Sequence, residues 1–102
     1  MTEKTERKQR ADDHVVFIGN KPFMNYVTGV VMQFTTQGAK EVVVKARGKF
    51  IARGVDVVEV VTKRFLENQI EVRGINIGSE EFKNEEGKTV RVSTIEIKLG
   101  KK

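Results

Sequence analysis

The sequence predicts an α+β fold, a single compact domain in which two strand–helix pairs precede two long strands. Two short apolar runs each lead into a stretch with apolar residues at 3- and 4-residue spacing, the mark of an amphipathic helix. Two later stretches alternate apolar and polar residues, as half-buried strands do. A chain of 102 residues also suits one hydrophobic core. We therefore expect the order β-α-β-α-β-β, with the last two strands forming a protruding hairpin.

The first strand and helix are predicted within residues 14–34. "HVVFIG" (14–19) is an apolar run closed by glycine, typical of a buried strand. Pro22 suits the first helical position, where its missing N–H costs nothing. The stripe of the helix is formed by Met24, Val27, Val31 and Phe34. Gly38 is a natural left-handed cap after it.

The second strand is predicted over 41–47 and the second helix over 50–67. The segment "VDVVEVV" is rich in β-branched residues, but Asp56, Glu59 and Lys63 fall at helical spacing. Apolar residues then cover roughly 180° of the helix surface, more than a small sheet needs. We expect the surplus to bury itself against another subunit.

The last two strands are predicted over 70–77 and 89–99. Their alternation changes phase at Gly74 and again at Ser93–Thr94, which indicates a bulge or bend in each strand. The connection 78–88 is polar, and we expect it to be a mobile loop with a turn at "NEEG". The outer half of this hairpin should leave the domain as an arm.

Composition excludes several classes of function. Residues 1–13 are mixed-charge without periodicity and predict a disordered tail before the domain of residues 14–102. There is no cysteine, and His14 is the only histidine, so we expect no metal, no cofactor and no enzyme. No apolar run is long enough for a membrane span, and we expect a cytoplasmic protein.

The positive charge is concentrated in one third of the chain. Residues 20–55 carry six basic residues against Glu41 alone, whereas bases and acids balance on either side. The cations stand where strands turn into helices: Lys21 after the first strand, and Lys45, Arg47, Lys49 and Arg53 around the second junction. A right-handed β-α-β crossover places both junctions on one edge of the sheet. Helix N-termini there attract phosphate, so we predict a polyanion-binding edge.

Two further residues at this edge have open interpretations. Asn20 and Tyr26 would add polar contacts to a nucleic acid. Asn20 alternatively caps the first helix, and Tyr26 alternatively packs in the core. Neither junction contains a dinucleotide-binding glycine motif or a P-loop. Extended nucleic acid therefore fits the pattern better than a bound nucleotide does.

The segments "VVFIGNKPFMNYV", "EVVVKARGKFIARGVDVVEVV", "KRFL" and "VRVSTIEIKL" closely resemble Alba, a family of small basic chromatin proteins of archaea. The resemblance implies a fold like the C-terminal domain of a bacterial translation initiation factor. It implies a homodimer that coats and compacts double-stranded DNA, also binds RNA, and reads little sequence. It also implies association between dimers along DNA, and hairpins that follow the minor groove. The protein would then be associated with the chromosome.

The resemblance also assigns roles to residues. It implies nucleic-acid contacts for Lys21, Arg47, Lys49 and Arg53, with Tyr26 nearby. Arg64 and Phe65 match the contact between dimers, although Phe65 alternatively packs in the core. The family commonly has lysine at the position of Asn20, where it is acetylated, and this regulation is impossible here. Segment 79–88 carries a net charge of −2, so we expect any contribution of the arm to come from Lys83, Lys88 and Arg91.

Two alternatives stay open at this point. Related proteins occur in ribonuclease P particles, so RNA is an alternative main partner, with the chain as a subunit of a ribonucleoprotein. A paralogue could also replace one subunit and give a heterodimer. Charge alone does not separate duplex DNA from structured RNA.

Overall fold

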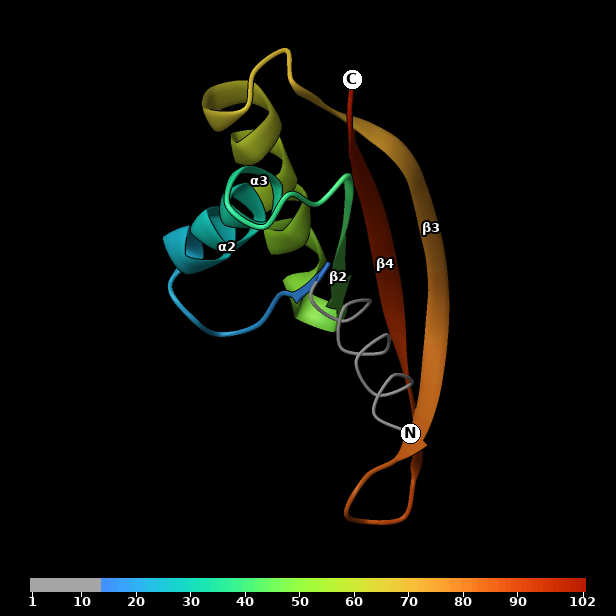
Figure 1. Ribbon diagram of the computed structural model, residues 1–102. Helices are drawn as coiled ribbons and strands as arrows, with labels where there is room; N and C mark the ends of the chain where they lie inside the picture. The colour runs from blue at the N-terminus through green and yellow to red at the C-terminus, as the bar shows by residue number, and fades with distance from the viewer. Residues whose placement is uncertain (1–13) are drawn as a thin grey trace, which may run out of the picture.

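The computed structural model describes residues 14–102 as one four-stranded sheet with helices on one face (Figure 1). The predicted tail, 1–13, lies outside the described residues. The strands are β1 (Val15–Phe17), β2 (Glu41–Arg47), β3 (Ile70–Lys83) and β4 (Thr89–Lys101). The helices are α2 (Phe23–Thr35) and α3 (Ile51–Val60), the latter preceded by a 3-10 turn (Gly48–Phe50) and followed by a π-helical turn (Val61–Phe65). The predicted α+β class and element order are confirmed.

Sheet topology explains why both helices lie on the same face. The strand order is β1-β2-β4-β3, with β1 parallel to β2 and β4 antiparallel to both of its neighbours. The chain therefore crosses over in the same direction twice, from β1 to β2 and from β2 to β3. Because such crossovers are right-handed, both helices are placed on one face. Among residues 14–102, no helix lies on the opposite face of the sheet.

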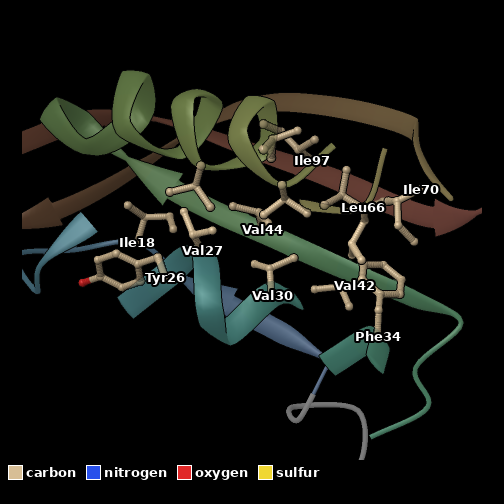
Figure 2. Packing of buried hydrophobic residues seen from close by; sticks show 14 of the residues in the cluster. Ile18, Tyr26, Val27, Val30, Phe34, Val42, Val44, Leu66, Ile70 and Ile97 are labelled. Atoms are coloured by element: carbon tan, nitrogen blue, oxygen red, sulfur yellow. The ribbon is translucent and has the colours of Figure 1, made fainter. Parts of the chain in front are cut away.

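The core lies between this face of the sheet and the two helices (Figure 2). Side chains of β2 alternate: Val42, Val44 and Ala46 are buried, while the intervening residues face away. The helices contribute mainly valines, together with Tyr26, Phe34 and Leu66 from their flanks and ends. One member of the predicted helical stripe is misplaced, because Met24 is exposed and Tyr26 and Val30 are buried instead.

Strand β1 differs from the expected buried strand. It forms the outer edge of the sheet and pairs only with β2. Ile18, just after the strand, points into the core, whereas Phe17 is 68% exposed on the helix-free face. The prediction of a buried strand over 14–19 is therefore wrong for one face, because an edge strand here is covered by helices on one side only.

Strands β3 and β4 form a long hairpin that extends beyond the helices (Figure 1). The bulge predicted near Gly74 is confirmed by a register shift between Val72 and Gly74. No register shift occurs at Ser93–Thr94, so the second predicted irregularity is wrong. The apolar residues of β4 change face there because the strand leaves the part of the sheet that the helices cover.

The loop predicted over 78–88 is wrong for residues 78–83, whereas the turn predicted at "NEEG" is confirmed. Strand β3 continues to Lys83, and only five residues remain for the turn. The side-chain Oδ1 of Asn84 accepts the backbone N–H groups of Glu86 and Lys88, at 2.9 and 3.0 Å. Gly87 takes the left-handed conformation, with φ 83°. An arm of paired strands with a hydrogen-bonded turn replaces the loop that polar composition had suggested.

Candidate nucleic-acid interface

The loop between β1 and α2 is fixed from the core side by hydrogen bonds to Tyr26. Its hydroxyl oxygen accepts the backbone N–H groups of Gly19 and Lys21, each at 2.9 Å. The side chain is buried in the core (Figure 2). Tyr26 thus has the packing role that was left open, and it shapes the loop that presents Lys21. A direct contact of Tyr26 with a ligand stays a prediction.

Arg53 ties the second helix to the same loop. Its Nη2 donates a hydrogen bond to the backbone oxygen of Lys21 at 2.6 Å. Its guanidinium lies 6.0 Å from the centroid of the Tyr26 ring, within the range of a cation–π contact. Two predicted cations from distant parts of the chain are thereby brought together. Asn20 is exposed beside them, and because the N-cap of α2 is Pro22, Asn20 does not cap the helix.

The junction between β2 and α3 supplies the next two cations. Arg47 is the last residue of β2, and Gly48 takes a positive φ of 58°, which turns the chain into the 3-10 helix. Lys49 is exposed on that turn, with its Nζ 5.5 Å from the centroid of Phe50. Because β1 and β2 are parallel, their C-terminal ends share one edge, and both junctions open there. This is the arrangement that the sequence predicted, and its contact with a nucleic acid stays a prediction.

The arm reaches back to this edge through an ion pair. Nη1 of Arg47 lies 2.8 Å from Oε1 of Glu80 on β3. Farther out, Arg91 pairs with Glu81 across the hairpin. Lys45 pairs with Glu96 on β4, at 3.4 Å. Lys83 and Lys88 are exposed at the end of the arm. Three of the predicted cations are therefore already paired with carboxylates.

Sequence reasoning missed these pairings although it noted the acids. The three cations and their partners lie between 10 and 51 positions apart in the chain, and only the strand register brings them together. The available signal for such ion pairs was the acidic composition of the arm beside a basic edge.

Arg64 and Phe65 lie at the C-terminal end of the continuous helical segment that starts at Gly48. Both belong to the π-helical turn and both are exposed, Phe65 by 49%. Core packing, the alternative interpretation of Phe65, is therefore contradicted. The role of the two residues in contacts between dimers stays a prediction.

Metal-binding clusters and membrane-spanning helices are both absent from residues 14–102. No group of three or more acidic or histidine side chains in this part of the chain could hold a metal ion. His14 Nδ1 lies 3.1 Å from Oε1 of Gln33. None of the described helices is long and apolar enough to cross a membrane.

Comparisons with known proteins agree on one family. The family model described as Alba matches residues 14–79. A "DNA/RNA-binding protein Alba" of Methanococcus maripaludis is 52% identical over 89 residues, covering 87% of this chain and 99% of that protein. The protein of the same name in Nanoarchaeum equitans is 60% identical over 88 residues, covering 85% and 97%. The solved structure of Alba from Thermoplasma volcanium superposes with a TM-score of 0.77 at 40% identity, covering 84% of this chain and 98% of that one.

Proposed function

The chain belongs to the Alba family, and we propose that it is an architectural protein that coats and compacts double-stranded DNA as a homodimer. It binds the phosphates of the nucleic acid and has little preference for base sequence. It also binds RNA, it is not an enzyme, and it is associated with the chromosome in the cytoplasm. The names of the relatives, which mention both DNA and RNA, support this assignment.

One observation carries the proposal: cations from separate segments gather at one edge of the sheet. Lys21 and Arg53 are in contact there, and Arg47 and Lys49 flank the neighbouring junction. The adjacent helix starts add backbone N–H groups that favour phosphate. Long exposed lysine and arginine side chains suit phosphates spaced along a polymer, but few groups at this edge suit the reading of base edges.

The homodimer is supported by apolar side chains that the rest of residues 14–102 does not cover. Val72, Ile75 and Ile77 of β3 are 44%, 58% and 82% exposed. Their partners on β4 belong to the face that the helices cover, but the helices leave these three β3 side chains exposed. Val55 on α3 is exposed as well. A second subunit that packs on this face would bury the surplus apolar surface that the sequence predicted.

A titration across salt concentration tests the proposal directly. Labelled duplex DNA and a duplex RNA of the same sequence are titrated with the protein at several salt concentrations, and the mass of the free protein is measured alongside. Affinity should fall by orders of magnitude between about 50 and 200 mM salt, because each neutralised phosphate releases counterions. Duplexes of unrelated sequence should bind alike. Binding without salt dependence, or to one sequence only, contradicts the proposal.

The dimer is tested with Ile77→Glu, which places a charge in the proposed interface. Light scattering should then give the mass of a monomer, while Met32→Glu, an equally drastic change on the exposed side of α2, should leave the dimer intact. Weaker coating by a folded monomer is expected, since each particle then has half the cations. A dimer that survives Ile77→Glu contradicts the proposed face.

Association between dimers is tested with Phe65→Ala. Removal of this exposed aromatic ring should lower the cooperativity of coating on long DNA more than it lowers the affinity of one dimer for a short duplex. Equal losses in both measurements contradict the assigned role of Arg64 and Phe65.

A further inference from the structure

The sheet face opposite α2 and α3 presents an aromatic ring beside a cation–anion pair. Strand register places Phe17, Lys45 and Glu96 in one row across β1, β2 and β4. The Nζ of Lys45 lies 5.7 Å from the centroid of the Phe17 ring and 3.4 Å from the Glu96 carboxylate. Phe17 is 68% exposed, more than any other phenylalanine of residues 14–102, so its ring face is available to a ligand.

These side chains line a pocket of about 560 Å³. The next row of the sheet, Arg47 and Thr94, lines it too, and so do Phe50 and Glu80. The pocket thus lies directly beside the basic edge, with Arg47 common to both. Its volume is ample for one planar heterocycle, and ligand pockets of proteins begin at about 300 Å³.

The charge of the pocket differs from that of the edge. Lys45 is paired with Glu96 and Arg47 with Glu80, so two cations and two anions line the cavity. A phosphate gains little from such a neutral lining. A nucleobase is itself neutral, stacks on aromatic rings, and carries donors and acceptors on its edges. The Thr94 hydroxyl and the Glu96 carboxylate supply matching polar groups.

We propose that this pocket binds one unpaired nucleobase of a single-stranded nucleic acid, stacked on Phe17, while the adjacent phosphates lie on the basic edge. The inference rests on the proposed function of that edge and assigns it a second type of substrate. Bases within a duplex are stacked and paired and cannot enter. The pocket therefore contributes to binding of single strands, loops and ends, but not to binding of intact duplex DNA.

The test compares Phe17→Ala with the unchanged chain on three probes of one mixed sequence: single-stranded RNA, single-stranded DNA and duplex DNA. Each single strand carries one 2-aminopurine, a fluorescent base whose emission falls when it stacks. Because base–aromatic stacking contributes about 1 kcal/mol or more, affinity for the single strands should fall about fivefold or more. Affinity for the duplex should change less than about twofold, since no unpaired base is offered.

Two controls separate stacking from structural damage. Phe17→Tyr keeps an aromatic face and should retain single-strand binding and the fluorescence change. Met32→Ala removes an exposed apolar side chain on α2, away from the pocket, and should alter no probe. If Phe17→Ala does not fold, Phe17→Leu replaces it, because leucine keeps an apolar side chain at the strand position without an aromatic face.

The possible outcomes distinguish failure of the pocket from failure of the basic edge. Unchanged single-strand affinity in Phe17→Ala, or an equal loss on the duplex, overturns the pocket and leaves the proposed function of the edge standing. If the unchanged chain binds none of the probes, the proposed function itself fails. A loss on the RNA strand alone, with DNA unaffected, supports the pocket and assigns it to RNA.

Discussion

The edge that carries Lys21 and Lys49 and the arm that carries Arg91 are both highly charged, but they hold their charges in different ways. At the edge, the supporting contacts are internal: a buried tyrosine hydroxyl and the Arg53 guanidinium fix the loop backbone. On the arm, Arg91 is held by an exposed ion pair with Glu81, and every residue from Val72 to Thr89 is exposed.

The difference shows which region can present free cations. Among residues 14–102, neither Lys21 nor Lys49 lies within ion-pair distance of an acid. Phosphate therefore meets uncompensated charge at the edge, but has to compete with carboxylates at Arg47 and on the arm. We expect the edge to supply most of the affinity and the arm to modulate it.

The largest effect is expected from removal of cations at the edge. The double variant Arg47→Ala/Lys49→Ala should weaken binding to all duplex sequences by about 100-fold or more, since contacts to charged groups are worth about 1.5–3 kcal/mol each. For a dimer that loses four cations, the slope of log affinity against log salt should become shallower by about 3 to 4. Fluorescence anisotropy across salt measures both quantities.

A matched control is offered by the end of β4. Lys101→Ala/Lys102→Ala removes the same net charge away from the edge, and its effect should be within about threefold, reflecting the weak, screened action of distant surface charges. If both double variants weaken binding equally, net charge and not the edge accounts for affinity, and the contrast between the two regions disappears.

An intermediate effect is expected from Tyr26→Phe, which removes the internal support without changing any charge. Two backbone N–H groups lose their acceptor, so the free energy of unfolding should fall by about 1–3 kcal/mol. Duplex affinity should fall only a few-fold, because Lys21 remains on a loosened loop. Denaturant unfolding and anisotropy measure the two changes, and Thr35→Ala, which removes a local hydroxyl bond on α2, is the control. Unchanged stability would contradict the supporting role of the hydroxyl.

The smallest effect is expected from the arm, and it has the opposite sign. Glu80→Gln frees the Arg47 guanidinium and removes a negative charge, so duplex affinity should rise about two- to fivefold, in keeping with the small energy of an exposed ion pair. Glu71→Gln makes the same change at the other end of β3, where the carboxylate pairs with Arg73. That control should leave affinity unchanged. A rise in both variants would assign the effect to general charge.

Much of the fold could be predicted because its signals are local. Helical spacing at Val27, Val31 and Phe34, the β-α-β connection and the bulge at Gly74 depend on short stretches of chain, and these predictions are confirmed. The hairpin and its protruding arm were predicted as well, but the continuation of β3 to Lys83 was not, because the outer strands are stabilised by each other and not by burial. Polar composition in 78–88 therefore indicated a loop where paired strands occur.

The candidate site likewise has features that the sequence predicts and features that depend on contacts between distant residues. Topology alone predicted that Lys21, Arg47 and Lys49 share an edge. The pairing of Arg47 with Glu80 depends on the register of three strands, and the Tyr26 hydroxyl bonds depend on side-chain packing, neither of which periodicity encodes. The exposure of Phe17 could have been inferred, since Val16 and Ile18 occupy the covered side of a strand whose residues alternate.

The outer strand β3 affects how readily closely packed copies of the protein aggregate. Within residues 14–102 it is the last strand of the sheet, and none of these residues forms a strand beside its outer row of backbone groups. Such an edge can template strand after strand into fibres when copies are packed closely, as on a coated polymer. The bulge beside Arg73 interrupts the row, and Glu80, Glu81 and Lys83 place charges in its outer part near the turn. We therefore expect the carboxylates of Glu80 and Glu81 both to restrain binding and to oppose strand pairing between neighbouring molecules.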